Sequence, residues 1–119
     1  FLSFFYSELI KKKKKEISII DDEFFSPLSI DDLIKIINYS IENKVHILNV
    51  GGPERKSRLD CLKDFLKVKN IKLINVNLYQ RKITKNSVII PKDVSFNINK
   101  IREFNRNMLT IDKFLKKIK

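Results

Sequence analysis

The sequence has 119 residues, enough for one small domain or part of one, with a single sheet and a few helices. Its hydrophobic fraction of 43% excludes a disordered chain, and no apolar run approaches the length that spans a membrane. The formal net charge is +11, but the basic residues are spread along the chain and only 11–15 form an unbroken run. We therefore expect a solvated basic surface, with neither nucleic acid nor a membrane as a partner.

Residues 1–15 are expected to form a helix that ends in lysines. The lysines suit the negative end of a helix dipole, and a core-facing helix is favoured over an amphipathic membrane anchor. The apolar run 16–20 follows as the first strand. The helix presents an apolar stripe of Phe1, Leu2, Phe4, Phe5 and Leu9.

An acidic corner, residues 21–29, joins this strand to the next helix. Pro27 removes a backbone donor and holds Ser26 away from helical geometry. Ser29 is then placed to accept a backbone N–H as the N-cap, and Asp32 lies near the positive end of the helix dipole. Apolar residues at helical spacing predict a helix over 30–43, namely Ile30, Leu33, Ile34, Ile37 and Ile41.

A second apolar run, 45–50, ends at Gly51-Gly52-Pro53 and is predicted to be a strand. Strand, helix and strand in succession indicate a βαβ-like unit with a right-handed crossover. His46 is the single histidine and has no acidic or cysteine companion at ligand spacing, so we interpret it as a packed residue and predict no metal site.

A helix start follows at Ser57, because Asp60 stands three residues later as in an acidic capping box. Arg55 and Arg58 lie where a strand feeds this helix, a place where open α/β sheets bind anions. The alternative to anion binding is that this segment is a basic turn exposed to solvent. The helix includes Cys61, interpreted as a core or boundary residue; a single cysteine cannot form an internal disulfide and fits a reducing cytoplasm.

The remaining chain predicts a third strand over 71–76, a loop over 79–87 and a short helix over 111–118. Thr110, with Asp112 two residues later, is predicted to cap the start of that helix. The fold class is therefore α/β, a small mixed sheet of about three strands flanked by helices. We treat residues 1–119 as one part of a larger fold.

Three segments, 22–33, 51–58 and 89–100, carry a family resemblance. The first resembles an Asp, aromatic, Ser-Pro-Thr and Asp-Leu corner, with Leu28 and Ser29 as departures, and the second resembles a Gly-Pro-Glu-Arg-x-Ser-Arg turn. Both are found in extended short-chain dehydrogenase/reductases, most closely in the dTDP-4-dehydrorhamnose reductase group. The resemblance implies a substrate-binding C-terminal part that lacks the N-terminal Rossmann fold.

Site residues follow from the resemblance as expectations. Ser26 and Pro27 would shape the corner beside the sugar, and Arg55 or Arg58 would contact the diphosphate. Ile90 stands where the family has an arginine that meets the nucleotide-sugar diphosphate. Other cations that could supply this charge are Arg81, Lys82 and Lys85.

No catalytic residue is assigned within the chain. It lacks the Gly-rich turn that a dinucleotide needs, and no Tyr is followed four residues later by Lys, so this segment alone is expected to be inactive. By resemblance, the complete protein would use NAD(P)H, bound outside this chain, to reduce the 4-keto group of a dTDP-4-keto-6-deoxyhexose in deoxysugar (rhamnose-type) biosynthesis. Its partners would be the nucleotide sugar, a Rossmann part and, in a homodimer, a second copy.

Three other functions stay open. The same lobe occurs in nucleotide-sugar epimerases and in a non-catalytic regulatory subunit related to methionine adenosyltransferase. An upstream Tyr-x-x-x-Lys would indicate chemistry, and its loss would indicate regulation. A basic nucleic-acid-binding module is the third alternative, and salt-dependent retention on nucleic acid would favour it.

Overall fold

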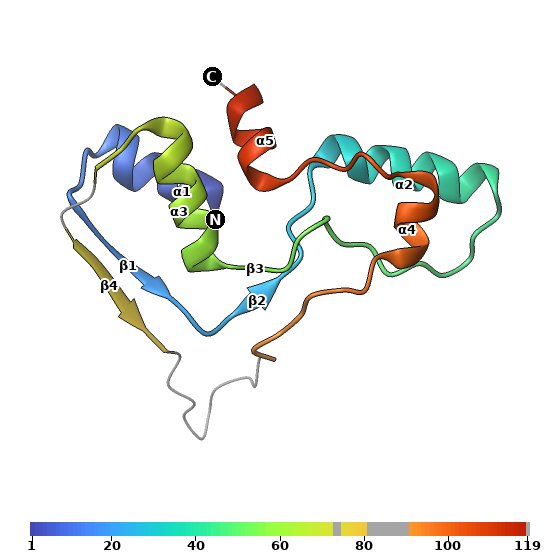
Figure 1. Ribbon diagram of the computed structural model, residues 1–119, viewed down its shortest axis with the longest axis horizontal. Coiled ribbons are helices and arrows are strands. Elements are labelled where there is room, and N and C mark those ends of the chain that lie inside the picture. The colour runs from blue at the N-terminus through green and yellow to red at the C-terminus, as the bar shows by residue number, and fades with distance from the viewer. Residues whose placement is uncertain (73–74, 81–90, 119) are drawn as a thin grey trace. The chain divides into compact units, whose positions relative to one another are not determined.

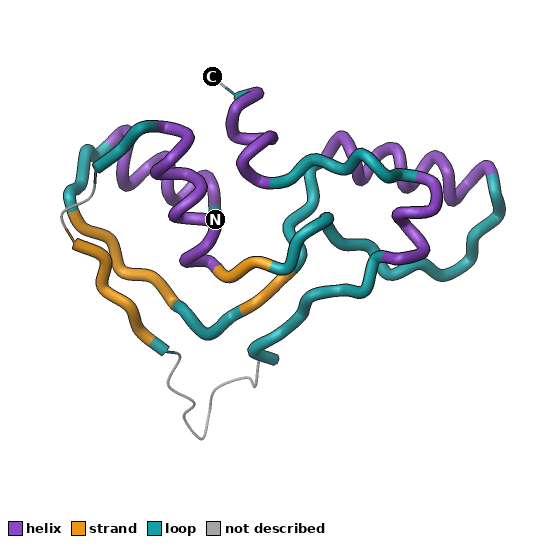
Figure 2. The backbone as a smooth tube through the Cα atoms, viewed as in Figure 1, coloured by secondary structure: helices purple, strands orange, loops and turns teal. Residues whose placement is uncertain are grey.

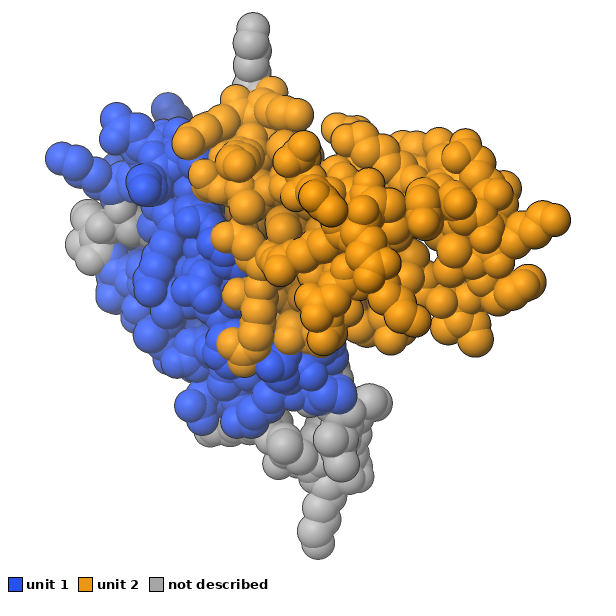
Figure 3. Space-filling view, turned by 45° about the vertical axis from the view of Figure 1, so that its right-hand side comes forward, with its two compact units in different colours: residues 1–24, 56–94 blue, residues 25–55, 95–119 orange. Residues whose placement is uncertain are grey.

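The computed structural model describes residues 1–72, 75–80 and 91–118, which form two compact units. Unit 1 comprises residues 1–24 and 56–94, and unit 2 comprises residues 25–55 and 95–119 (Figure 3). The elements in chain order are α1 (Leu2–Phe5), the π-helix η1 (Tyr6–Lys11), β1 (Glu16–Ile20), β2 (Phe24–Phe25), α2 (Ile30–Glu42), β3 (Lys56–Ser57), α3 (Arg58–Lys69), β4 (Asn75–Tyr79), α4 (Asn99–Phe104) and α5 (Ile111–Lys117) (Figure 1).

Unit 1 is built on a parallel pair of strands, β1 and β4, with Ile17 opposite Val76. Ile17 and Ile19 of β1 are buried, as their alternation with polar residues requires. The helix α3 packs against this strand and against α1, where the rings of Phe5 and Phe65 lie 5.7 Å apart. A second two-stranded sheet is formed by β2 and β3.

The N-terminal helix is present, but it changes geometry after one turn. Its second half is the π-helix η1, in which Lys12 N donates to Ser7 O, five residues back. Phe5 and Leu9 are buried, whereas Phe1 and Phe4 stay partly exposed. The apolar stripe expected over the whole helix is thus buried only at two of its positions.

Helix α3 begins as the sequence predicts. Ser57 is the N-cap and its Oγ accepts from Asp60 N at 3.0 Å, while Ser57 N donates to Asp60 Oδ2 at 3.0 Å. Two orphan backbone donors are satisfied by this reciprocal pair. The helix ends at Lys69, and the next residue, Asn70, is its C-cap, with a φ of 51° in the left-handed region that asparagine tolerates well. The helix buries Cys61, Leu62 and Phe65.

Unit 2 is centred on α2 and α4. Its core joins Ile36 of α2 to residues from the later segment, and Tyr39 stacks on Phe104 with ring centroids 3.7 Å apart. The stacked pair links the last turns of the two helices. The other buried members of this cluster are Ile98, Ile101 and Met108.

The predicted strand over 45–50 is wrong. Among the described residues this segment belongs to no sheet and is drawn as a loop (Figure 2). The predicted βαβ-like unit is wrong with it, because the parallel partner of β1 is β4. The physical reason is that a strand is stabilised by backbone hydrogen bonds to a neighbouring strand, and the described residues give 45–50 no such neighbour. His46, expected on that strand as a packed residue, is exposed instead.

Two further boundaries differ from expectation. The third strand was predicted over 71–76 and is observed over Asn75–Tyr79, and α5 ends at Lys117 with Ile118 exposed. The expectations for Arg81, Lys82, Lys85 and Ile90 fall outside the described residues. No helix in the described ranges is long and apolar enough to cross a lipid bilayer.

Candidate functional site

The corner that leads into α2 is held by the side chains of Ser29 and Asp32. Ser29 Oγ accepts from Asp32 N at 3.1 Å and donates to Asp32 Oδ2 at 2.8 Å. Asp32 Oδ2 also accepts from Leu109 N at 2.8 Å, and Asn105 Nδ2 donates to Asp32 Oδ1 at 3.4 Å. The corner is thereby tied to the segment between α4 and α5, and its backbone course is fixed.

Asp32 is fully buried, and burial is the strongest influence on its carboxyl, acting to raise the pKa. The hydrogen bonds from Leu109, Ser29 and Asn105, with the nearby ammonium of Lys35, outweigh burial and lower the pKa below the ordinary aspartate value. The carboxylate is therefore ionised at neutral pH. Its oxygens serve the fold of unit 2, which agrees with the structural role predicted for it.

The Gly51-Gly52 turn lies directly against this corner. Gly52 N donates to Ser26 O at 3.0 Å, and a Cβ built on Gly52 would stand 1.5 Å from Pro27 O. A Cβ on Gly51 would stand 2.9 Å from Ser26 Cβ. Only glycine permits such a close approach. The corner and the turn, about 25 residues apart in sequence, thus form one surface.

That surface is hollowed. A cavity of about 260 Å³ is lined by Ser26 and Arg55, the two residues expected to share a cleft, together with part of the α4 entry. Ser26 Oγ accepts from Phe96 N at 3.1 Å, so the corner also fixes the opposite wall. The remaining lining residues are Gly52, Pro53, Glu54, Asn97, Ile98, Asn99 and Arg102.

Two arginine residues line the hollow. Arg55 is exposed at the end of the glycine turn, and Arg102 of α4 donates from Nη2 to Pro53 O at 3.2 Å. Arg102 did not follow from the sequence as a site residue. The available signal was weak: Arg102 directly follows the buried Ile101 and is exposed at the edge of the face that α4 buries.

The chemistry of this hollow suits an anion attached to a ring. Guanidinium groups bind phosphate through paired, charge-assisted hydrogen bonds, and the partly exposed ring of Phe96 offers an apolar or stacking face. Asn97 and Asn99 add amide donors and acceptors that match hydroxyl groups. Ser26 and Glu54 also line the hollow, and the Ser26 hydroxyl is held by Phe96 N, so we interpret the arrangement as a candidate binding site.

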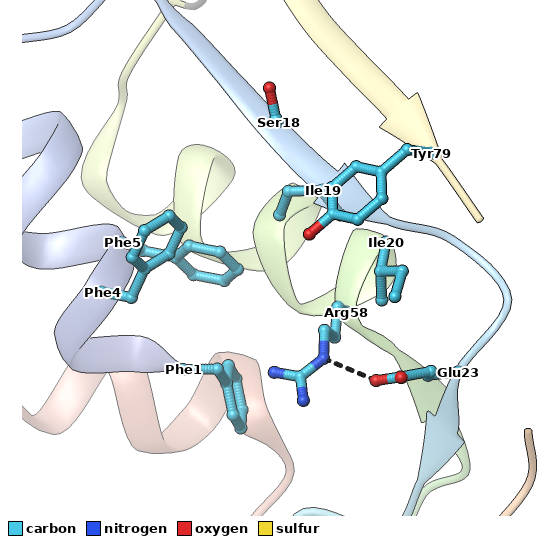
Figure 4. A pocket seen from close by; sticks show the side chains of 9 residues that line it. All are labelled: Phe1, Phe4, Phe5, Ser18, Ile19, Ile20, Glu23, Arg58 and Tyr79. Carbon is cyan, nitrogen blue, oxygen red and sulfur yellow. Dashed lines mark hydrogen bonds and ion pairs between the residues drawn. The ribbon is translucent and has the colours of Figure 1, made fainter. Parts of the chain in front are cut away.

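Arg58 lies elsewhere, in unit 1. Its Nε donates to Glu23 Oε2 at 3.1 Å, and it lines a separate hollow with aromatic residues (Figure 4). Phe1, Phe4 and Phe5 stand on one side of this hollow and Tyr79 on the other. The structure thus brings Ser26 together with Arg55 but places Arg58 in a different pocket, against a carboxylate. Pro27 is not among the described residues that line either hollow; its carbonyl packs on Gly52.

The glycine turn does not fit a dinucleotide cofactor. A pyrophosphate needs open backbone beside glycine, whereas Gly52 faces Pro27 O and Gly51 faces Ser26 and Phe96. No group of three or more His, Cys, Asp or Glu side chains within 1–72, 75–80 and 91–118 is placed to hold a metal ion. Among the hollows that the described residues form, we take the one beside Arg55 as the candidate site for an anionic ligand.

Comparison with known proteins finds similar solved structures. No protein-family model and no curated protein sequence matches the chain. A dTDP-4-dehydrorhamnose reductase from Bacillus anthracis, in complex with NADP, has a TM-score of 0.72 and 24% identity over 95% of this chain and 41% of its own. The same kind of reductase from Yersinia enterocolitica has a TM-score of 0.71 and 18% identity, over 92% of this chain and 39% of its own.

These likenesses confirm the resemblance at the level of the fold. The chain has the α/β fold of a part of dTDP-4-dehydrorhamnose reductases, and it spans about two fifths of the length of the structures it matches. More than half of each of those chains has no counterpart here. The activity, substrate and partners of a complete protein are therefore matters for proposal.

Proposed function

We propose that this chain is the substrate-binding C-terminal part of a nucleotide-sugar reductase, and that the complete protein reduces the 4-keto group of a dTDP-4-keto-6-deoxyhexose with NAD(P)H. The observation that carries the proposal is the hollow that Ser26 and Arg55 share. The fold likeness to dTDP-4-dehydrorhamnose reductases supports the substrate class. The deoxysugar product would be of the rhamnose type.

In this proposal Arg55 and Arg102 meet the diphosphate, and the Ser26-Pro27 corner borders the sugar. Both arginines line one hollow, so a diphosphate bound there would be contacted from the glycine turn and from α4 at once. Arg58 donates to the Glu23 carboxylate, so it would act as the second predicted anion contact only if a ligand replaced Glu23 or bound to Arg58 beside it. NAD(P)H would be bound by another part, since the glycine turn is closed by Pro27.

Binding of dTDP-rhamnose, a stable product of this chemistry, tests the proposal by calorimetric titration. Replacing both Arg55 and Arg102 with Gln should weaken binding by at least about 100-fold, because each charge-assisted hydrogen bond contributes about 1.5–3 kcal/mol and two are lost. Arg106→Gln is the matched control, since Arg106 is an exposed arginine of the same unit outside the hollow. Equal binding by the double variant and the control would contradict the assignment.

A second measurement separates the reductase from the alternatives. The longest polypeptide that carries this chain should oxidise NAD(P)H when the 4-keto sugar nucleotide is added. Binding of the sugar nucleotide without turnover would indicate a regulatory subunit. Binding of single-stranded oligonucleotides that competes with dTDP-rhamnose would indicate the basic binding module.

A further inference from the structure

Seven exposed lysines gather at one end of unit 1. Five of them form the run 11–15, where η1 ends, and two lie where the chain leaves α3. Asn75 N, at the start of β4, donates to Lys15 O at 3.2 Å, so the chain that leaves α3 reaches β4 beside this run (Figure 1). Basic residues are spread along the sequence, and the fold brings this set together. We call these residues the lysine end: Lys11, Lys12, Lys13, Lys14, Lys15, Lys67 and Lys72.

The lysine end keeps a surplus of positive charge. Glu8 pairs with Lys12 Nζ at 2.6 Å and with Lys14 Nζ at 2.5 Å. The Asp64 carboxylate of α3 is held by Lys56 Nζ at 2.7 Å, and Lys56 lies outside this set. The segment 8–16 carries five lysines against two carboxylates, and the fold adds two more lysines. The surface at this end of unit 1 is therefore strongly cationic.

A hollow with an aromatic wall lies beside these lysines. A cavity of about 610 Å³ is lined by Phe4 of α1 together with Lys14 and Lys15. Phe4 is 47% exposed, and Tyr6 on the same helical segment is 44% exposed. The remaining lining residues are Glu8, Glu16, Ile17 and Ser18. Ammonium groups beside partly exposed aromatic rings match the boundary of a lipid bilayer, where headgroups meet acyl chains.

We infer that the lysine end is a docking face for the surface of a bilayer rich in anionic phospholipid. Charge complementarity favours this partner, because clusters of about four to eight cationic side chains are typical of segments that bind anionic lipid headgroups. Both η1 and α3 end here, and the carbonyl groups at a helix C-terminus favour nearby ammonium groups. The protein would lie on the bilayer surface through this face. The inference goes beyond the proposed function and does not depend on it.

Nucleic acid fits the same face less well. The bases of a single strand stack on open aromatic faces. Lys11 Nζ already lies over one face of the Tyr6 ring, 5.9 Å from its centroid, and the Phe4 ring packs against Phe5 with centroids 6.0 Å apart. The lysine end presents ammonium point charges, which lack the planar fork with which arginine stacks on bases and pairs with them. The observations therefore favour a lipid surface over a nucleic acid.

Sedimentation with vesicles tests the inference on the longest polypeptide that carries this chain. Vesicles that mix phosphatidylserine with phosphatidylcholine should bind the protein, and vesicles of phosphatidylcholine alone should not. Changing Lys13, Lys15 and Lys72 together to Gln should weaken binding by about 100-fold, since each lysine at an anionic surface contributes about fivefold. This triple variant leaves the two lysines that pair with Glu8 in place, so η1 keeps its ion pairs.

A matched control removes the same charge from unit 2 and should weaken binding by less than about fivefold, because screening confines the attraction to lysines near the lipid. The control substitutions are Lys44→Gln, Lys100→Gln and Lys113→Gln, all at exposed positions. An equal loss in the triple variant and the control would overturn the inference, since net charge alone would then explain binding. Equal binding to vesicles with and without phosphatidylserine would overturn it as well.

Amine labelling locates the face on the unaltered protein. Vesicles that contain phosphatidylserine should slow the acetylation of Lys13, Lys15 and Lys72 severalfold, and should leave Lys100 and Lys113 unchanged. Uniform acetylation at all five positions would contradict docking through the lysine end. Stronger binding of single-stranded oligonucleotides than of the mixed vesicles would assign the face to nucleic acid and overturn the inference. Neither readout uses a sugar nucleotide, so each result is independent of the titration with dTDP-rhamnose.

Discussion

The backbone N–H of Leu109 donates to Oδ2 of Asp32 at 2.8 Å, across 77 residues of sequence. This single bond connects the first turn of α2 to the segment that leads into α5. Because the carboxylate is fully buried, it cannot exchange this partner for water without a change in structure. The bond makes Asp32, at the start of α2, a structural anchor for unit 2.

Replacing Asp32 with Asn should lower the free energy of unfolding of unit 2 by about 2 kcal/mol. The amide has one acceptor oxygen, so it cannot serve Leu109 N, Ser29 and Asn105 together, and a buried donor is left without a partner. Denaturant unfolding followed by hydrogen exchange at 105–109 measures the loss. Asp31→Asn, an exposed neighbour in the same helical turn, is the control and should change stability by less than about 0.5 kcal/mol.

Acid should destabilise unit 2 through the same carboxylate. The folded pKa of Asp32 is lowered relative to the unfolded value of about 3.9, so its contribution is complete above that value and is lost as pH falls toward the folded pKa. The unfolding midpoint in urea should therefore fall between about pH 5 and pH 2 in the parent chain. In the Asp32→Asn variant this slope should become shallower; an unchanged slope would contradict the assignment.

Gly52→Ala should disrupt the candidate site and the fold around it. The new Cβ would meet the carbonyl oxygen of Pro27 at 1.5 Å, and backbone cannot move aside as a flexible side chain can. We expect a loss of about 1–3 kcal/mol or more in unfolding free energy. Gly51→Ala is the matched control and should cost less, since its Cβ would stand 2.9 Å from Ser26 Cβ. Thermal unfolding of the two variants compares them.

Ser26→Ala should weaken ligand binding more than it weakens the fold. The hydroxyl accepts from Phe96 N, and its loss removes a bond of about 0.5–1.5 kcal/mol that positions one wall of the hollow. Affinity for dTDP-rhamnose should fall by about 3- to 10-fold. Ser40→Ala, which removes a hydroxyl bonded to Ile36 O within α2, serves as the control and should leave affinity unchanged.

Local chemistry was sufficient to predict the starts of α2 and α3, but the cap predicted at Thr110 for α5 is wrong, because the Thr110 hydroxyl donates to Asp112 Oδ1 and makes no capping hydrogen bond. Ser29 and Ser57 cap α2 and α3 because their hydroxyls reach backbone donors three residues ahead, an effect contained within one turn. The strand over 16–20 also follows from its own residues. These features depend on neighbours in sequence, so the sequence alone determines them.

Features that depend on distant partners were not predictable in the same way. Segment 45–50 has strand residues but no ladder in the described structure, and the parallel pairing of β1 with β4 joins residues about 60 positions apart. The placement of Arg102 beside Arg55 likewise depends on how α4 packs on Ile36. Each outcome is decided by tertiary contacts that periodicity does not encode.

Cys61 is the chain's single cysteine, and it is fully buried in α3 of unit 1. A thiol reagent added to the solution can reach its sulfur only when α3 moves away from its packing partners. The rate of labelling would then measure the opening of unit 1. The Asp32→Asn substitution, by contrast, destabilises unit 2. Comparing the labelling rates of the parent chain and the Asp32→Asn variant would show whether a loss of stability in unit 2 changes the opening of unit 1.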